Sequence, residues 1–347
     1  MSVSACITSV SGPVLLAEER AFLRDAQPWG VILMGRSCVS KAQVAALTDE
    51  IKGVLGRDAL IFVDQEGGRV ARLKAPEWPK FPAAGAYGEL FDSAPEAAEQ
   101  ACYLGHLLMG HELSQVGVHA DCAPCGDLRQ SDTHDAIGDR SFGYGVETVT
   151  TLTEAALKGL SDAGVAGVIK HMPGQGRATL DSHYDLPSVR ADDTALQQDI
   201  SVFVALADQV SMGMTCHVVF EAIDDGLPAT ISPTVISETI RKRIGFEGLL
   251  MTDDLGMEAL GGTLADRGAK ALAAGCDVLL HCSGFLKDPA EILNEMQIIA
   301  DTAGPLTGTA LSRADAADAA VQPAKPVDFE QSWARFSELM SDMEARA

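Results

Sequence analysis

The 347-residue sequence predicts an α/β protein, specifically a TIM-type (β/α)8 barrel forming a single domain with a C-terminal helical extension. Eight short apolar runs recur along the chain, each of the kind that fills a buried parallel strand, and amphipathic helical patterns separate them. This alternation indicates a parallel sheet, and eight such units close most naturally into a barrel. Because periodicity does not report closure, an open doubly wound sheet remains the alternative fold.

The predicted strands are spread over the first 281 residues without an obvious break. They cover approximately residues 7–10, 30–34, 59–64, 117–122, 165–171, 211–217, 248–253 and 276–281. The segments between them carry helix-start signals. Ser40 and Gln43 form a potential capping box before an amphipathic run, and Ser232 and Pro233 are typical of an N-cap and a first helical residue.

The C-terminal part differs in composition. Residues 310–320 are rich in Ala and Asp, Pro323 and Pro326 interrupt the pattern, and an amphipathic run resumes at residues 329–343. Too few apolar residues remain there for an independent core. We therefore expect residues 1–304 to form the barrel domain and residues 305–347 to form a helical extension packed on it.

Composition narrows the possible partners. Asp+Glu total 49 against 26 Lys+Arg, a net charge of -23, which argues against electrostatic binding to nucleic acid or to an anionic membrane. The first ten residues contain no Lys or Arg ahead of a long apolar segment, and no run is long enough to cross a bilayer. We expect a cytoplasmic monomer that binds a small-molecule substrate.

The eight cysteines are scattered through a long chain, which favours reduced and mostly buried thiols. Cys122 and Cys125 form one C-x-x-C, but no second pair follows at zinc-site spacing. The sequence therefore predicts neither a metal nor another cofactor.

Polar residues follow the predicted strands, where the functional face of such a barrel is formed. They are Asp64 after the third strand, Lys170 and His171 after the fifth, Cys216 and His217 after the sixth, Asp253 and Asp254 after the seventh, and His281 after the eighth. One polar strand end is commonly structural. Five ends facing one mouth favour a catalytic or binding site.

The segment KHMPGQGRATLDSH, from Lys170 to His183, combines a strand end with a potential catalytic loop. Asp181 and His183 are separated by one residue, so their side chains can hydrogen-bond. A carboxylate beside an imidazole orients the ring and raises its basicity, as general acid/base catalysis requires. Gly174 and Gly176 suggest a loop that can close over a bound substrate.

Several motifs together resemble the single-domain β-N-acetylhexosaminidases of glycoside hydrolase family 3. They are DQEGGRVARLK (64–74), IGDRSFG (137–143), KHMPGQG with DSH (170–183), PATIS (228–232) and MTDDLGM (251–257). Their order and spacing agree over about residues 30–284. Two positions depart from the family pattern: Gln175 replaces a common histidine, and Arg177 replaces a common aspartate.

The resemblance assigns roles residue by residue. It implies that Asp253 is the nucleophile of a retaining glycosidase, and that His183 is the acid/base with Asp181 as its orienting partner. It further implies a set of residues that hold the N-acetylglucosamine unit, namely Asp64, Arg72, Arg140, Lys170 and His171.

A cytoplasmic member of this group is expected to remove terminal, non-reducing β-linked N-acetylglucosamine from 1,6-anhydro-N-acetylmuramic acid, with or without peptide, during peptidoglycan recycling. Two alternatives of other classes remain open at this point. One is a metal-dependent barrel hydrolase using His171, His183, Asp253 and Cys216 or His281. The other is a noncatalytic barrel that binds N-acetylglucosamine.

Overall fold

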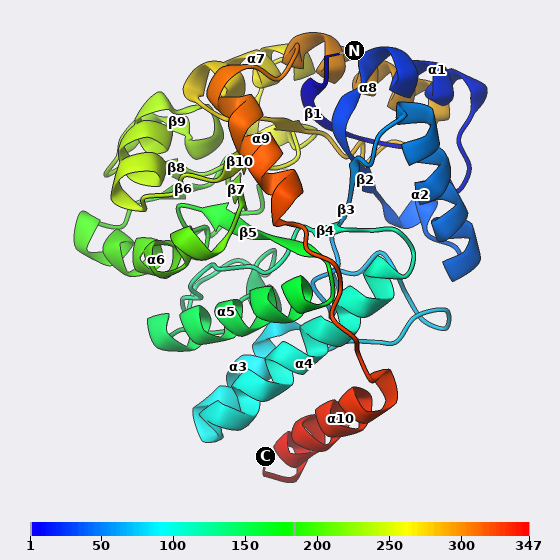
Figure 1. Cartoon of the computed structure of the whole chain (residues 1–347). Helices are drawn as coiled ribbons and strands as arrows, with labels where there is room; N and C mark the ends of the chain where they lie inside the picture. The colour runs from blue at the N-terminus through cyan, green and yellow to red at the C-terminus, as the bar shows by residue number, and fades with distance from the viewer. Residues whose placement is uncertain (1, 183–184, 347) are drawn as a thin grey trace.

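The computed structural model describes residues 2–182 and 185–346, and its centre is an eight-stranded parallel sheet (Figure 1). The strand order is β10-β7-β5-β4-β3-β2-β1-β11, so each strand pairs with its neighbours in the chain of βα units. The strands are β1 (Ser4–Ser9), β2 (Pro28–Leu33), β3 (Leu60–Val63), β4 (Ala120–Asp121), β5 (Ala166–Met172), β7 (Met212–Thr215), β10 (Leu249–Met251) and β11 (Leu279–Leu280). All eight overlap the predicted apolar runs, although their bounds differ by several residues at some ends.

The two ends of this sheet meet and close it into a barrel. Met251 at the end of β10 forms a parallel bridge with Val278, just before β11. The Asp277 amide donates to the Leu250 carbonyl at 2.8 Å, and the Thr252 amide donates to the Val278 carbonyl at 3.2 Å. The predicted barrel is therefore confirmed, and the open doubly wound sheet is excluded.

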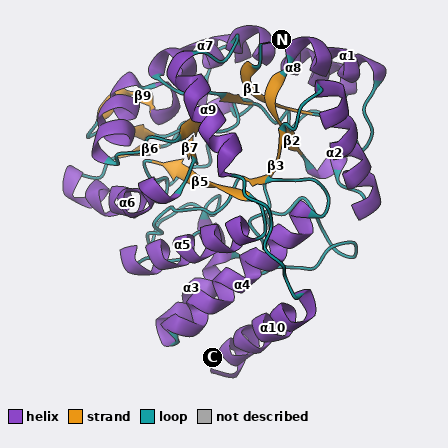
Figure 2. Cartoon of the chain, viewed as in Figure 1, coloured by secondary structure: helices purple, strands orange, loops and turns teal. Residues whose placement is uncertain are grey.

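Helices surround the strands on the outside, as Figure 2 shows. Every residue of β2 and β3 is buried, because these strands lie between the barrel interior and the helical layer. The surrounding helices are α1 (Ala17–Ala26), α2 (Lys41–Leu55), α3 (Ala84–Ser93), α4 (Pro95–Ser114), α5 (Val146–Asp162), α6 (Asp193–Leu206), the π-helical segment η5 (Val235–Arg243), α7 (Leu264–Ala274) and α8 (Pro289–Ala303).

The predicted helix starts are correct in position and partly correct in detail. The Ser40 hydroxyl accepts from the Gln43 amide and so caps α2. The Gln43 side chain accepts from the Val39 amide instead of reaching the Ser40 amide, so the capping box is incomplete. The Ser232 hydroxyl accepts from the Val235 amide and caps the helical turn that leads into η5.

A second, three-stranded sheet lies outside the barrel and was not predicted. It contains β6 (Ser188–Val189), β8 (Val219–Phe220) and β9 (Asp224–Pro228), with β6 parallel and β9 antiparallel to β8. This small sheet joins the segment that follows the 170–183 loop to the segment that follows β7.

Two helices follow α8 in the C-terminal segment, α9 (Gly308–Ala320) and α10 (Phe329–Arg346). In Figure 1, α10 lies beside α4 at the end of the molecule opposite the N-terminus. Phe336 of α10 is buried, and its ring lies 6.5 Å from each of Phe81 and Tyr87 between ring centroids. The α10 helix thus covers apolar side chains of the barrel domain.

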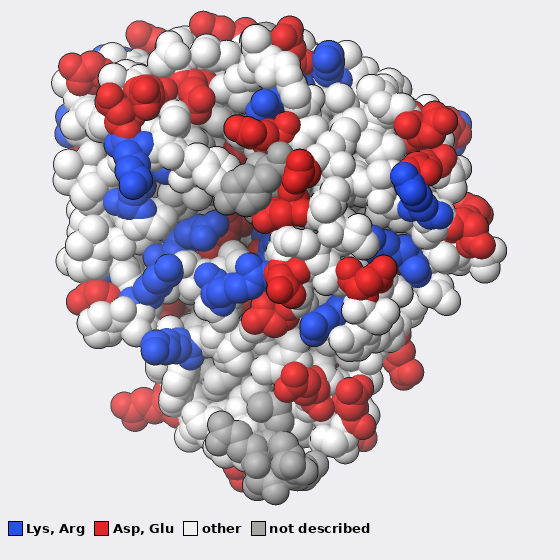
Figure 3. Space-filling model, turned by 180° about the vertical axis from the view of Figure 1, so that it is seen from behind, with Lys and Arg blue, Asp and Glu red and all other residues white. Residues whose placement is uncertain are grey.

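The surface carries many charged side chains, and the cysteines are free. Acidic and basic side chains surround a hollow near the middle of the face seen in Figure 3. Among the described residues, no helix has both the length and the apolar character needed to cross a bilayer. All eight cysteines are free thiols and only Cys38 is not fully buried, as the sequence predicted.

Candidate active site

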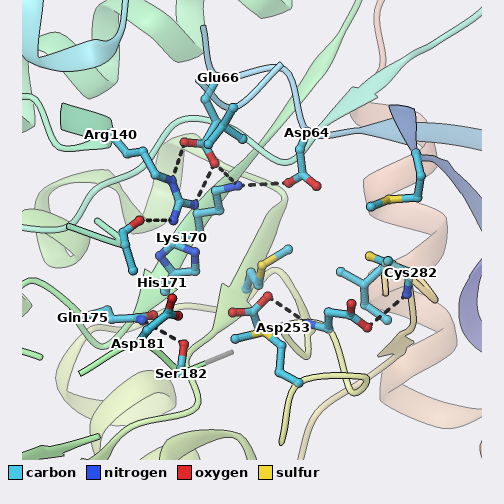
Figure 4. A pocket seen from close by; sticks show the side chains of 18 of the residues that line it. Asp64, Glu66, Arg140, Lys170, His171, Gln175, Asp181, Ser182, Asp253 and Cys282 are labelled. Carbon is cyan, nitrogen blue, oxygen red and sulfur yellow. Dashed lines mark hydrogen bonds and ion pairs between the residues drawn. The ribbon is translucent and has the colours of Figure 1, made fainter. Parts of the chain in front are cut away.

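A pocket of about 440 Å³ opens at the carboxyl ends of the barrel strands, where the sequence placed the functional face. Its lining includes all five predicted sugar-binding residues, Asp64, Arg72, Arg140, Lys170 and His171, together with Asp181 and Asp253. Figure 4 shows most of these side chains directed toward one shared space. His183, the predicted acid/base, lies outside the described residues.

Asp64 follows β3 and is held by two cations from different strand ends. Its carboxylate oxygens accept from Lys170 Nζ at 3.2 Å and from Arg72 at 3.0 Å. Burial would raise the pKa of Asp64, but the charges of Lys170 and Arg72 outweigh it and lower the pKa. Asp64 is therefore an ionised acceptor at neutral pH, suited to sugar hydroxyl groups.

Glu66 lies at the centre of the cationic part of the pocket. Its carboxylate forms a bidentate pair with Arg140, both contacts at 2.8 Å, and lies 2.6 Å from Lys170 Nζ (Figure 4). Burial would raise the pKa of Glu66, but Arg140 and Lys170 lower it. Arg69 pairs with Asp139, whereas Glu66 positions Arg140 and Lys170, two of the predicted sugar-binding residues.

His171 is oriented by a buried carboxylate that the sequence analysis missed. Its Nδ1 lies 2.7 Å from Asp127, and Asp127 also accepts from the amides of His171 at 3.3 Å and Gln175 at 2.6 Å. This arrangement leaves His171 Nε2 as the ring nitrogen available to a ligand. Asp127 comes soon after the fourth strand, in CAPCGDL, and that strand-end position was the signal that could have identified it.

The loop after β5 contributes the other side of the pocket. The Gln175 side chain donates to the Ser182 hydroxyl at 3.2 Å, and Asp181 and Ser182 both line the pocket. Two buried polar atoms, Gln175 Oε1 and Arg72 Nε, have no hydrogen-bond partner within the described part of the chain. Because buried polar atoms are normally paired, both are positions where a polar ligand would gain hydrogen bonds.

Arg177, the second departure from the family pattern, does not contact the predicted sugar-binding residues and points toward α6. Its guanidinium donates to the buried Asp199 of α6 at 2.5 Å and to the Ala195 carbonyl at 3.1 Å. Arg177 is absent from the lining of the pocket. Arg177 therefore links the middle of the 170–183 segment to α6 through hydrogen bonds.

Asp253 lies just beyond β10, and a backbone donor fixes one of its oxygens. The Asp254 amide donates to Asp253 Oδ1 at 2.8 Å. The carboxylate of Asp254 itself accepts from the amides of Gly256 at 2.9 Å and Cys282 at 3.0 Å. Figure 4 shows Asp253 pointing into the pocket opposite the Lys170 group.

The remaining predicted strand-end residues lie behind the pocket wall. His217 Nε2 lies 3.0 Å from the Asp254 carbonyl and its Nδ1 lies 2.8 Å from the Thr230 hydroxyl, so this histidine supports the turn after Asp253. Burial lowers the pKa of His217. His281, the residue after β11, contacts the Asp254 carboxylate. Neither imidazole lines the pocket.

One buried group has donor atoms close enough for a metal ion. The candidate ligand atoms of Cys125, Asp127 and His171 lie within 4.8 Å of one another, and they hydrogen-bond to one another. Within the described ranges, the group does not include Asp253, Cys216 or His281. Of the described ligands of the metal-dependent alternative, only His171 belongs to this group.

Comparison with known proteins adds an independent finding. Residues 8–304 match the model of the glycosyl hydrolase family 3 N-terminal domain. A beta-hexosaminidase from Alkalilimnicola ehrlichii is 39% identical over 287 residues, covering 82% of this chain and 82% of that protein. A beta-hexosaminidase from Methylococcus capsulatus is 39% identical over 276 residues, covering 78% of this chain and 80% of that protein.

Comparison with solved structures also finds a close match in fold. The crystal structure of NagZ from Neisseria gonorrhoeae in complex with N-trifluoroacetyl-D-glucosamine matches with a TM-score of 0.81 at 28% identity. That match covers 98% of this chain and 99% of the other. The span matched by the family model includes every residue that lines the pocket.

Proposed function

The chain belongs to glycosyl hydrolase family 3 and is a β-N-acetylhexosaminidase, and on that premise we propose that it is a retaining exo-enzyme of peptidoglycan recycling. Its proposed substrates are muropeptides, from which it removes terminal, non-reducing β-linked N-acetylglucosamine. The proposed aglycone is 1,6-anhydro-N-acetylmuramic acid, with or without its peptide. The observation that carries this proposal is the meeting of Asp253 with the predicted sugar-binding residues in one pocket.

We assign the nucleophile role to Asp253. Retention requires a carboxylate that attacks the anomeric carbon and forms a covalent glycosyl-enzyme, which water then hydrolyses. The hydrogen bond from the Asp254 amide occupies Oδ1 and leaves Oδ2 for the attack. A carboxylate at the end of a barrel strand is held by the rigid scaffold, as a nucleophile requires.

We assign proton transfer to His183, with Asp181 as its orienting partner. The imidazole donates a proton to the leaving oxygen in the first step and takes one from water in the second. The location of Asp181 in the pocket lining is consistent with this assignment.

The charged residues suit a neutral sugar ring. Arg72, Arg140 and Lys170 are already paired with Asp64 and Glu66, so the pocket offers directed donors and acceptors without a large excess of either charge. Such groups can bind hydroxyl and acyl oxygens. The N-trifluoroacetyl-D-glucosamine bound by the Neisseria gonorrhoeae neighbour supports an N-acylated glucosamine as the sugar.

The decisive experiment compares wild type with Asp253→Ala on an aryl β-N-acetylglucosaminide and on the corresponding aryl glucoside. Wild type should prefer the first substrate and release the β-anomer first, as followed by NMR. Asp253→Ala should lose about 10⁴-fold or more in kcat. Initial release of the α-anomer, or full activity of Asp253→Ala, would refute the retaining mechanism through Asp253.

A leaving-group series tests the acid/base assignment separately. His183→Ala should lower kcat by about 10² to 10⁴-fold on a disaccharide, whose leaving oxygen needs a proton. The loss should be much smaller for the glycosylation of an aryl substrate with an acidic phenol. Full activity of His183→Ala on the disaccharide would remove His183 from the mechanism. Purified GlcNAc-1,6-anhydro-MurNAc, compared with its peptide-bearing form, then tests the proposed substrate directly.

A further inference from the structure

Asp254, the residue after Asp253, is held through both its backbone carbonyl and its side-chain carboxylate. The Asp254 carbonyl accepts from the Met257 amide at 3.1 Å and lies 3.0 Å from His217 Nε2. Its carboxylate accepts from the amides of Gly256 and Cys282 and lies 3.2 Å from His281 Nδ1. The position of the Asp254 amide, which donates to Asp253, therefore depends on these contacts.

The geometry around His281 defines its charge. His281 Nδ1 lies 3.2 Å from Asp254 Oδ1, and its Nε2 lies 2.8 Å from Glu295 Oε2 on α8. An ionised carboxylate can only accept a hydrogen bond, whereas a neutral imidazole has one donor and one acceptor nitrogen. Both contacts are satisfied together only when both ring nitrogens carry protons. His281 is therefore held as an imidazolium.

The other charged groups near His281 are consistent with this state. Burial alone would lower the pKa of His281, but the hydrogen bonds that its ring donates to Asp254 and Glu295 outweigh burial and raise the pKa to about 9. The Arg36 guanidinium donates to the carbonyls of Cys282 and Ser283, next to His281 in the chain. Glu258 lines a separate pocket of about 270 Å³ together with His281, Ser283 and Glu295.

We propose that His281, held as an imidazolium between Asp254 and Glu295, is a positioning residue for the nucleophile. It fixes the Asp254 carboxylate, and through it the amide that orients Asp253. His281 does not line the sugar pocket, so it acts through Asp254 and not on the substrate. This inference rests on the proposed role of Asp253 as nucleophile.

The amide contact contributes to both chemical steps. In the first step it holds Asp253 Oδ1, so that Oδ2 meets the anomeric carbon in a fixed orientation. In the second step water attacks the anomeric carbon and the bond to Asp253 breaks, returning negative charge to the departing carboxylate. The Asp254 amide stabilises that charge.

The expected pH effect has a definite sign. A histidine with a raised pKa is charged below that pKa and loses its charge as the pH rises through it. Above about pH 9, His281 can no longer donate to both carboxylates, and the Asp254 contact weakens. Removing the Glu295 charge lowers the pKa of His281, so the loss should begin at lower pH.

The test uses Glu295→Gln, because Glu295 lines only the smaller pocket and its side chain is 33% exposed, so the fold tolerates the change. The substrate is an aryl N-acetylglucosaminide with an acidic phenol, so that protonation of the leaving group does not set the alkaline limb. The alkaline limb of kcat should move down by about one to two pH units, while KM changes less than about twofold. Glu291→Gln removes the same charge from an exposed position of α8 and should leave the profile unchanged.

A double mutant separates positioning from a general structural effect. His281→Gln should lower kcat across the pH range, and adding Glu295→Gln to it should move the alkaline limb no further. An unshifted limb in Glu295→Gln, or an equal shift in Glu291→Gln, would overturn the proposal. These outcomes are independent of Asp253→Ala, whose retained activity would overturn the nucleophile assignment itself.

Discussion

Single side chains in the pocket depend on partners from distant parts of the chain. Glu66 follows β3, yet it contacts Arg140 from η2 (Gly138–Arg140) and Lys170 from β5. The three side chains are at most 14% exposed, so their charges are poorly solvated and depend on one another. These charged groups thus hold one another in fixed positions, an arrangement that reduces the reorganisation that ligand binding would require.

Replacing the shared anion tests this dependence. Glu66→Gln should lower the free energy of unfolding by about 3 kcal/mol, because it leaves Arg140 and Lys170 buried without their common counter-charge. It should also lower kcat/KM by about 10²-fold, because both cations lose their orientation. Urea unfolding and steady-state kinetics measure the two effects. Glu77→Gln, an exposed change in the same loop, should alter neither.

The sequence predicted which residues lie at the pocket better than it predicted which side chains pair with one another. Asp64, Lys170 and Asp253 were predictable because each follows an apolar strand, and barrel geometry brings strand ends together. The bidentate Glu66 contact and the Asp127 contact with His171 were not, because each joins loops 74 and 44 residues apart in sequence. Local pattern carries no information about such pairs.

Among the elements, the loop after β5 is constrained more closely than its glycines suggested. A Cβ on Gly176 would lie 1.9 Å from the Leu128 carbonyl oxygen, and one on Gly174, where φ is +132°, would lie 2.8 Å from Asp199 Cβ. The Thr133 hydroxyl also donates to the Gly176 carbonyl at 2.5 Å. In this structure both glycines permit close packing of the loop, in addition to any role in closure.

Gly176→Ala tests this packing. The methyl group cannot fit against the Leu128 carbonyl, so the loop must move, and the unfolding free energy should fall by about 1 to 3 kcal/mol. Displacement of Asp181 and Ser182, which line the pocket, should lower kcat/KM by about 10²-fold. Kinetics and urea unfolding provide the readouts.

The matched control is Gly53→Ala in α2, where a Cβ would meet nothing within 4 Å. There the substitution should raise stability by about 0.5 to 1 kcal/mol, because alanine loses less backbone entropy in a helix. Unchanged activity in both variants would show that the loop tolerates displacement.

The strands of the barrel could be predicted from the sequence, whereas those of the outer sheet could not. The barrel strands were predictable because strands buried on both faces appear as apolar runs. The outer sheet was not, since β6 and β8 have two residues each and β9 reads Asp-Asp-Gly-Leu-Pro, without apolar alternation. Such short strands depend on tertiary pairing more than on local pattern.

For the whole molecule, closure of the barrel is the step that periodicity could not establish. The bridge between Met251 and Val278 puts β10, which leads to Asp253, next to β11, which leads to His281. An open sheet would have separated these two strands at opposite edges. Closure therefore creates both the pocket and the contact between His281 and Asp254.

The net charge of the chain makes a prediction about its overall stability. With 49 acidic and 26 basic residues, the folded protein carries a charge of -23 near neutral pH, and like charges repel more strongly in a compact state. Raising the salt concentration from about 0.01 M to 0.1 M shortens the screening length from about 30 Å to 10 Å. The free energy of unfolding in urea should therefore rise with sodium chloride over this range. Repeating the titration near the sequence isoelectric point of about 4.6 removes the net charge, and there the salt effect should vanish or reverse. If salt instead lowered stability at neutral pH, specific surface ion pairs would outweigh the net repulsion.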